Sequence, residues 1–513
     1  MDKKKILTIA QTITGWLVPL RFALLAVFLF LLMFLFALNG QWIADFWVHS
    51  AAVRELITNI SDPSHHQLLL DVPFPGYSPY TLAVAFFGKL LNVEAISILS
   101  AAGILNLVLF ILGLRMFVYA TITNHKSSSA FYALLLTLFW WGFSPWYISG
   151  FFHIGVLGYV MPYPSTFAMA LSLITLSLNQ RRIQNNQRWL LPAEFLLTII
   201  VLISHLPTFV FLAVGLISFV LTAKKQLLFE VLIAVSILAG SLLLSAIWPY
   251  FSMLNFLLVE SGAYHTYHQQ SSLYQELLSR TWPALAALPL VVAKIRANPR
   301  YPLTIMLLLL SGVYIFGAIT GMGILGRTIS YIMLLLQFFI AEFLADFETR
   351  KRLPNIAGWL QPLLVSAGVV LVCLLLFGRP FGRTVKLSLP GRPSTYQDYL
   401  FLSDRTAQYD VILADLDTSE MVPAFGGKVV ALDQPLSFVP DYSGRQSDVE
   451  RFFTRQVPTS ERLETIEKYK VDYLLVNKHA NEDWEELVTS FSSFGVIDYE
   501  NDLLVLISLA RLH

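Results

Sequence analysis

Long apolar runs separated by short polar connections occupy most of the chain. Each of these runs approaches the roughly 20 apolar residues that a helix needs to cross a hydrocarbon core of about 30 Å. The runs at 189–204, 206–222 and 281–294 are short for a full crossing. The whole set falls at about 15–38, 95–121, 129–149, 156–178, 189–204, 206–222, 227–249, 281–294, 303–322, 328–346 and 357–377. The pattern therefore predicts an α-helical polytopic membrane protein with about eleven transmembrane helices.

Basic residues gather on one side of this predicted bundle. Counting the N-terminus, alternate connections and adjoining helix ends, 17 lysines and arginines lie on the side of the N-terminus. The opposite side, without the C-terminal tail, has four: Arg54, Lys89, Arg280 and Arg327. Since basic residues near helix ends stay in the cytoplasm, the N-terminus is expected inside. The first run, 15–38, is too long for a signal-peptide core and lacks a small-residue cleavage site, so it predicts a retained signal anchor.

Two stretches are too polar to lie in the membrane. The first is an outer loop at 39–80 that continues into a half-apolar segment, Pro79 to Asn92, suited to the membrane interface. The second is the tail, 379–513, where strand-like runs alternate with polar helical stretches at 445–456, 459–470 and 481–492. The strand-like runs are Val411–Ala414, Val429–Leu432, Tyr473–Val476 and Leu503–Ile507.

The domain organisation follows from these stretches. We expect a transmembrane domain at 1–378, which includes the first outer loop and juxtamembrane segments at 39–92, and a soluble α/β domain at 379–513. An odd number of spans, starting from a cytoplasmic N-terminus, places the tail on the outer face of the membrane.

Composition narrows the function classes. The chain is 56% apolar and 13% charged, against about 25% charged in soluble domains. A net charge of +1 argues against a nucleic-acid partner, which requires a basic excess. Cys373 is the single cysteine, so an intrachain disulfide is excluded. The sequence has no P-loop, no dinucleotide fingerprint and no His-Glu-x-x-His motif, which leaves ATP-driven transport without support.

Asp45 is the leading catalytic candidate. It follows the first span in Ala44-Asp45-Phe46-Trp47-Val48-His49, and in a helix the i, i+4 spacing places Asp45 and His49 on one face. A carboxylate at the outer membrane surface is suited to act as general base on an acceptor hydroxyl. The alternative is a solvated carboxylate at a helix end within an interfacial aromatic belt.

The other loop residues are weaker candidates. Arg54, His65 and His66 are supporting or substrate-binding candidates, and ordinary loop histidines are the alternative to a metal role. Adjacent histidines point in different directions, and no metal-ligand spacing is present, so a divalent cation has no clear ligand set. His205 lies between two short apolar runs, where a polar residue faces a cavity or caps a helix that begins at a proline.

Arginine candidates for phosphate binding lie on the predicted outer side. Arg327 stands at the outer end of a span, and the loop before it carries no other charge. Guanidinium grips a phosphate bidentately, so Arg327 is a candidate for the phosphate of a lipid carrier. Snorkelling to lipid headgroups is the alternative. Arg280 has the same two interpretations.

The order of these parts resembles the GT-C superfamily of membrane glycosyltransferases. The likeness rests on a first helix, the acidic outer loop with Asp45, the half-apolar segment Tyr77–Leu82 and a long second span ending in Arg115. It implies a first outer loop that carries active-site acids, two juxtamembrane helices and a polyprenyl-phosphate-linked sugar donor. Many members have paired acids in that loop, whereas here Phe46 follows Asp45 and the next acid is Glu55.

The resemblance implies a concrete reaction. Asp45 would take the proton of an acceptor hydroxyl, while Arg327, with Arg280 or a histidine, would stabilise the departing polyprenyl phosphate. The anomeric centre would be inverted, and the acceptor would be an envelope glycan, lipid or protein. Two other classes stay open from the sequence: a transporter or flippase for a lipid-linked substrate, and a non-catalytic scaffold for envelope assembly.

Overall fold

The computed structural model describes residues 3–223, 226–258, 272–350, 360–434 and 439–509, and the chain divides into two compact units. The first unit comprises residues 1–38, 103–248 and 252–390. The second comprises 39–102, 249–251 and 391–513. The first outer loop and the tail, far apart in the sequence, therefore belong to one folded unit. The helix α4 (Ala95–Thr121) begins in the second unit and continues into the first.

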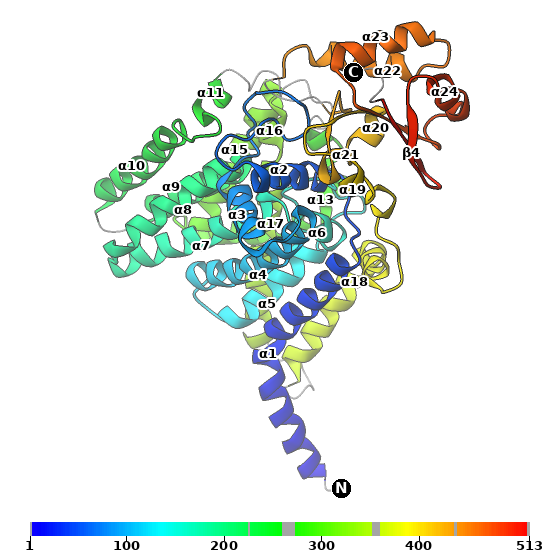
Figure 1. Cartoon of the computed structure of the whole chain (residues 1–513). Coiled ribbons are helices and arrows are strands. Elements are labelled where there is room, and N and C mark those ends of the chain that lie inside the picture. The colour runs from blue at the N-terminus through cyan, green and yellow to red at the C-terminus, as the bar shows by residue number, and fades with distance from the viewer. Residues whose placement is uncertain (1–2, 224–225, 259–271, 351–359, 435–438, 510–513) are drawn as a thin grey trace. The chain divides into compact units, whose positions relative to one another are not determined.

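The first unit is a bundle of helices (Figure 1). Besides most of α4, its described helices are α1 (Lys3–Leu38), α5 (Lys126–Phe139), α6 (Ile154–Val160), α7 (Pro164–Asn185), α8 (Leu191–Ser204), α9 (Leu206–Leu221), α10 (Leu227–Ser245), α11 (Met253–Leu258), α13 (Leu277–Leu285), α14 (Leu288–Ala297), α15 (Pro302–Thr320), α16 (Gly323–Gly326), α17 (Thr328–Arg350) and α18 (Gln361–Ser388). The expected domain boundary after residue 378 lies inside α18, which bends at Phe377 and continues to Ser388.

Six helical stretches in the described part of the chain are long and apolar enough to cross a membrane. They are Val18–Leu38, Ala95–Thr121, Leu227–Ser245, Pro302–Thr320, Gly323–Thr349 and Gln361–Ser388. The pair α6 and α7 makes a seventh if it counts as one span, although its axes differ by 106°. These stretches coincide with predicted apolar runs, so the polytopic helical class is confirmed.

The other predicted runs form shorter helices. The run 129–149 gives only α5, which ends at Phe139, and α5 is buried from Ser128 onward. The helix stops because the next residues pair with another segment: the Gly142 and Phe143 amides donate to the carbonyls of Arg280 and Ser279 at 2.8 and 3.1 Å. A helix of 14 residues is about 21 Å long, so α5 is an internal helix of the bundle, shorter than a full crossing.

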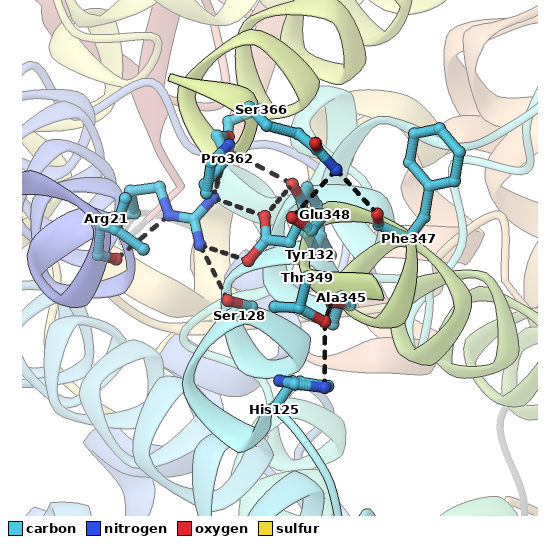
Figure 2. Close-up of polar contacts among 12 residues, drawn as sticks. Arg21, His125, Ser128, Tyr132, Ala345, Phe347, Glu348, Thr349, Pro362 and Ser366 are labelled. Carbon is cyan, nitrogen blue, oxygen red and sulfur yellow. Dashed lines mark hydrogen bonds and ion pairs between the residues drawn. The ribbon is translucent and has the colours of Figure 1, made fainter. Parts of the chain in front are cut away.

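A buried polar cluster joins four helices of the bundle (Figure 2). Arg21 of α1 forms a bidentate ion pair with Glu348 of α17, with N–O distances of 2.9 and 3.0 Å. Arg21 also donates to Ser128 of α5 and Ser366 of α18, and the Tyr132 hydroxyl donates to Glu348 at 2.7 Å. The cluster therefore joins the middle of α1 to the start of α5, the last turn of α17 and the first turns of α18.

A second buried cluster closes the predicted inner end of another helix group. Arg182 of α7 is paired with Glu194 of α8 at 3.0 Å and with Glu230 of α10 at 2.5 Å. Asn179 donates to the same Glu194 carboxylate at 2.9 Å. Since an unpaired charge in this position would be costly, these pairs fix the order in which α7, α8 and α10 pack.

The second unit contains a five-stranded sheet in the order β2-β1-β3-β5-β4. Strand β1 is parallel to β2 and β3, while β5 is antiparallel to β3 and β4. The strands are β1 (Val411–Leu413), β2 (Lys428–Val429), β3 (Tyr473–Asn477), β4 (Val496–Glu500) and β5 (Leu504–Ser508). The helices are α2 (Phe46–Thr58), α3 (Pro79–Leu91), α19 (Leu402–Arg405), α20 (Leu416–Ser419), α21 (Val422–Phe425), α22 (Tyr442–Phe453), α23 (Thr459–Tyr469) and α24 (Trp484–Phe491).

The tail contains a small sheet with helices between its strands, which supports the predicted α/β class in part. Strands β1, β3 and β5 coincide with three of the four predicted runs, and α22, α23 and α24 overlap the predicted helical stretches. Strand β2 shares only Val429 with the predicted run Val429–Leu432. The core of the sheet is apolar, with Leu413, Leu474 and Val505 fully buried. Strand β2 is also joined to the first outer loop, because the Val429 amide donates to the Gln67 carbonyl at 2.8 Å.

Candidate active site

Asp45 lies at the N-terminus of α2, directly after the first long helix of the chain. Its carboxylate is partly exposed and makes no capping bond to the helix amides. The preceding residue, Ala44, has φ of 54°, in the left-handed region that L-residues rarely adopt. Backbone strain of this kind is concentrated at functional sites. Trp42 and Phe46, on either side of Asp45 in the sequence, stack with ring centroids 4.4 Å apart, and this contact holds the start of the helix in place.

His49 lies one helical turn after Asp45, as the spacing predicts. Its amide donates to the Asp45 carbonyl at 3.0 Å. Burial lowers the pKa of His49 to about 4, and the neighbouring Asp45 carboxylate only partly opposes this shift. His49 is therefore neutral at pH 7, and the negative charge of Asp45 is not cancelled by an imidazolium.

The most extensive polar contacts of the unit surround Glu55, which sequence reasoning did not select. Glu55 of α2 and Lys428 of β2 form an ion pair of 2.6 Å with side chains 0% and 1% exposed. The carboxylate also accepts from Gln408 at 2.8 Å and from the amide and hydroxyl of Ser64 at 3.1 and 3.0 Å. Burial lowers the pKa of Lys428, while Glu55 opposes that shift. This pair fastens the Asp45 helix to the sheet.

Arg54 also helps to attach α2 to the tail. Its guanidinium donates to the Pro423 carbonyl at 3.4 Å, and burial lowers its pKa to about 10. On the same surface of α2, Trp47 packs against Phe425 with ring centroids 5.8 Å apart and against Tyr396 at 5.6 Å. Arg54 thus has a structural role in holding α2 against the tail, and its substrate-binding role stays a prediction.

His65 and His66 are buried in the loop that Lys428 holds. The Lys428 ammonium donates to the carbonyl oxygens of both residues, at 2.8 and 3.2 Å. Nδ1 of His65 accepts from the amides of Gln67 and Leu68, so His65 carries its proton on Nε2. The His66 ring stacks on Phe74 with centroids 3.7 Å apart. Burial lowers the pKa of His65 to about 3. Burial also lowers the pKa of His66 well below its usual value, so both rings are neutral at pH 7.

The tail brings additional carboxylates toward Asp45. Glu420, between α20 and α21, is partly buried, and burial raises its pKa, with a further rise from the charges of Asp45, Asp417 and Asp433. The charge of Asp45 therefore acts on a second acid, Glu420, although no acid follows Asp45 directly in the loop sequence. Nothing in the local sequence around Glu420 indicates this, because it is separated from Asp45 by most of the chain.

His205, in the first unit, caps α9. Its Nδ1 accepts from the Thr208 amide at 3.3 Å and lies 2.7 Å from the Thr208 hydroxyl, which in turn lies 2.9 Å from the Tyr331 hydroxyl. The capping interpretation of this residue therefore matches the structure, and α8 and α9 meet at it.

Arg280, also in the first unit, has several partners. It forms an ion pair with Glu276 at 2.8 Å and donates to the Ser144 carbonyl at 2.9 Å, and its guanidinium lies 5.2 Å from the Trp146 ring centroid. These contacts connect α13 to the segment that follows α5. Arg280 therefore has a structural role, and its phosphate-binding role stays a prediction.

Arg327 differs from Arg280. It follows α16, and its backbone carbonyl accepts from the amide and the hydroxyl of Ser330 at 3.1 and 2.9 Å. Its side chain is partly exposed, and within the described ranges it takes part in no ion pair.

A metal site has no ligand set in the described part of the chain. No three histidine, cysteine, aspartate or glutamate side chains among the residues that the structure places lie close enough to hold one ion. We therefore assign no metal ligands.

Comparison with known proteins bears on the fold. No family model matches the sequence, and no curated protein matches it. Among solved structures, ArnT from Cupriavidus metallidurans in the apo state matches with a TM-score of 0.57 and 13% identity, over 98% of this chain and 99% of that one. The same protein bound to undecaprenyl phosphate matches with a TM-score of 0.57 and 12% identity, over 96% and 98%.

A second kind of transferase has a similar structure. The archaeal oligosaccharyltransferase AglB from Archaeoglobus fulgidus, in complex with an inhibitory peptide and a dolichol-phosphate, matches with a TM-score of 0.56 and 12% identity. The match covers 94% of this chain and 75% of that one. ArnT, an aminoarabinose transferase, and AglB are both GT-C superfamily members. The predicted resemblance is confirmed at the level of the fold, which extends over nearly the whole chain.

Proposed function

We propose that this chain, a protein with the GT-C fold, is a membrane glycosyltransferase that moves a sugar from a polyprenyl-phosphate-linked donor to a hydroxyl of an envelope glycan, lipid or protein. The observation that carries the proposal is Asp45: a partly exposed carboxylate at the start of α2, with no capping bond and a neutral histidine beside it. The lipid phosphates bound to the similar proteins, undecaprenyl phosphate in ArnT and dolichol-phosphate in AglB, support this donor class.

The proposed reaction is a single displacement. Asp45 accepts the proton of the acceptor hydroxyl as its oxygen attacks the anomeric carbon, and the bond from that carbon to the phosphate oxygen breaks. The electron pair of that bond leaves with the polyprenyl phosphate, and the configuration of the anomeric centre is inverted. Arg327 stabilises the negative charge on the departing phosphate. Arg280 contributes less, because Glu276 already neutralises its charge.

The proposed function can be tested by measuring sugar transfer by the purified protein from a polyprenyl-phosphate-linked donor, with the wild type and with variants of Arg327. We expect release of polyprenyl phosphate and transfer of the sugar by the wild type. Arg327→Ala should lower the rate strongly, and Arg327→Lys should restore it only in part, since lysine keeps the charge but loses the bidentate fork. Arg300→Lys, at an exposed arginine after α14, is the matched control and should be fully active. No transfer by the wild type with any such donor would reject the function, and full activity of both Arg327 variants would reject the phosphate role.

We also propose the membrane orientation that this function needs. The N-terminus lies in the cytoplasm, the chain crosses or enters the bilayer about eleven times, and the tail faces outward with the first outer loop. The union of that loop and the tail in one unit supports this orientation, because both must then lie on the same side.

Reporter fusions test the orientation. A reporter fused after Arg352 should be active only in its cytoplasmic form, and one fused at His513 only in its exported form. The measurement is paired activity of a cytoplasmic and an exported reporter at each site. A cytoplasmic C-terminus would contradict the proposed number of crossings.

A further inference from the structure

The outer part of α18 carries a row of basic residues that the proposed reaction does not use. Arg379, Arg383 and Lys386 are all exposed. In a helix, positions i, i+4 and i+7 lie within an arc of about 60°, so these three side chains form one stripe along α18. We call Arg379, Arg383 and Lys386 the α18 basic stripe.

An exposed apolar surface precedes the stripe on α18, before the bend at Phe377, and Cys373 before the bend and Thr384 after it are both buried. Leu371 and Leu375 precede it at i, i+4 spacing and are 59% and 77% exposed. The opposite face of α18 is buried through Cys373, Phe377 and Thr384. One face of this helix therefore passes from exposed leucines to exposed basic residues, while the other packs into the bundle.

Packing holds the stripe in place. Phe381 contacts Phe28 of α1 and Phe139 of α5, with ring centroids 6.2 and 5.6 Å apart. The Thr384 hydroxyl donates to the Ile154 carbonyl at the start of α6 at 3.0 Å. Because the buried face is anchored to three helices, the basic face keeps a fixed direction outward.

The charge of the stripe has no acidic counterpart. Residues 349–397 contain no aspartate or glutamate. In the described ranges, the ion pairs involve other residues, and the charge of Arg383 acts instead on Tyr147 and Tyr159. Two tyrosines thus lie beside this guanidinium, where hydroxyl and guanidinium donors can serve one anion together.

The position of the stripe is unusual for the proposed orientation. Basic residues next to a span are depleted on the outer side. Three of them retained on one face, with no acid to pair with, indicate a ligand of opposite charge. The spacing also fits a membrane: the stripe covers about 10 Å of helix, comparable to the polar headgroup layer beyond the hydrocarbon core.

We propose that the α18 basic stripe binds the phosphate headgroup of an anionic glycerophospholipid in the outer leaflet, with the acyl chains against Leu371 and Leu375. Arg379 and Arg383 grip the phosphodiester, and Lys386 adds a charge at the outer edge. The inference rests on the proposed outward direction of this end of α18, and it does not depend on catalysis.

The test measures lipid binding to the full-length protein in detergent by native mass spectrometry. Phosphatidylglycerol is titrated, with zwitterionic phosphatidylcholine as the comparison lipid. The variant Arg379→Gln/Arg383→Gln should bind phosphatidylglycerol about 25-fold more weakly, taking about fivefold for each basic residue near the surface. Arg296→Gln/Arg300→Gln removes two exposed charges near the end of α14 and serves as the matched control. It should bind like the wild type.

Four outcomes would overturn the proposal. These are equal affinity for the two lipids, an equal loss in both double variants, unchanged binding in the stripe variant, and displacement of phosphatidylglycerol by equimolar undecaprenyl phosphate, which would assign the stripe to the donor. Arg379→Lys/Arg383→Lys keeps the charges and should retain binding within a few fold, which separates a folding defect from lost recognition. No sugar donor is present, so a failure here is distinct from a failure of the proposed glycosyl transfer.

Discussion

Replacing Asp45 with asparagine is expected to lower the rate of sugar transfer by roughly 10²- to 10⁴-fold, the range associated with loss of a general base. The substitution keeps the volume of the side chain and removes only its basicity. Folding should be preserved, because the carboxylate makes no capping bond that asparagine would have to replace. The measurement is turnover with a lipid-linked donor, alongside the melting temperature of the purified variant.

Two features of the site make this test specific. Asp71→Asn removes an exposed carboxylate from the same loop and should leave the rate unchanged. His49 stays neutral in Asp45→Asn, because Asp45 is the group that raises its pKa. A lost activity therefore cannot arise from a newly charged histidine. If the folded Asp45→Asn protein transfers sugar at the wild-type rate, Asp45 is not the general base. Another acid must then have that role, and Glu420 is the first to test.

The second large effect is expected at the buried ion pair. Lys428→Met leaves the Glu55 carboxylate buried without its cation, so the free energy of unfolding of the second unit should fall by about 3–5 kcal/mol. The double variant Glu55→Gln/Lys428→Met removes both charges and should lose less than the sum of the single variants. Chemical denaturation in detergent, followed by tryptophan fluorescence, measures the difference.

An exposed pair in the same unit provides the control. Lys468 and Asp448 are 2.6 Å apart with side chains 54% and 31% exposed, so Lys468→Met should change stability little. Additive losses for Glu55→Gln and Lys428→Met would show that the two charges are not coupled in the folded protein.

The fold was largely predictable where one segment determines its own structure. Strands such as Tyr473–Asn477 are runs of buried apolar residues, and their type can be read locally. Strand β4 (Val496–Glu500) was missed because it lies at the edge of the sheet, with Val496 and Ile497 half exposed and an irregular register at Ile497 and Tyr499. Its pattern has neither a buried run nor a clean alternation.

The candidate site was predictable only in part, for a related reason. Asp45 could be found because its position directly after a span is a local signal. Glu55 and Lys428 are 373 positions apart, and a lysine at the start of a strand is usually solvated. No local rule predicts that such a lysine is fully buried. The same holds for Glu420, on which the charge of Asp45 acts only in the folded second unit.

The division of the second unit between residues 39–102 and 391–513 has a consequence for biosynthesis. The helix that carries Asp45 is made early, but the lysine that neutralises Glu55 leaves the ribosome only after the transmembrane helices of the first unit. Until then Glu55 has no cation, and the first outer loop has no β2 to pair with. A chain that stops short of Lys428 therefore never completes the support of Asp45. The candidate site is thus complete only in molecules that have been translated at least as far as Lys428.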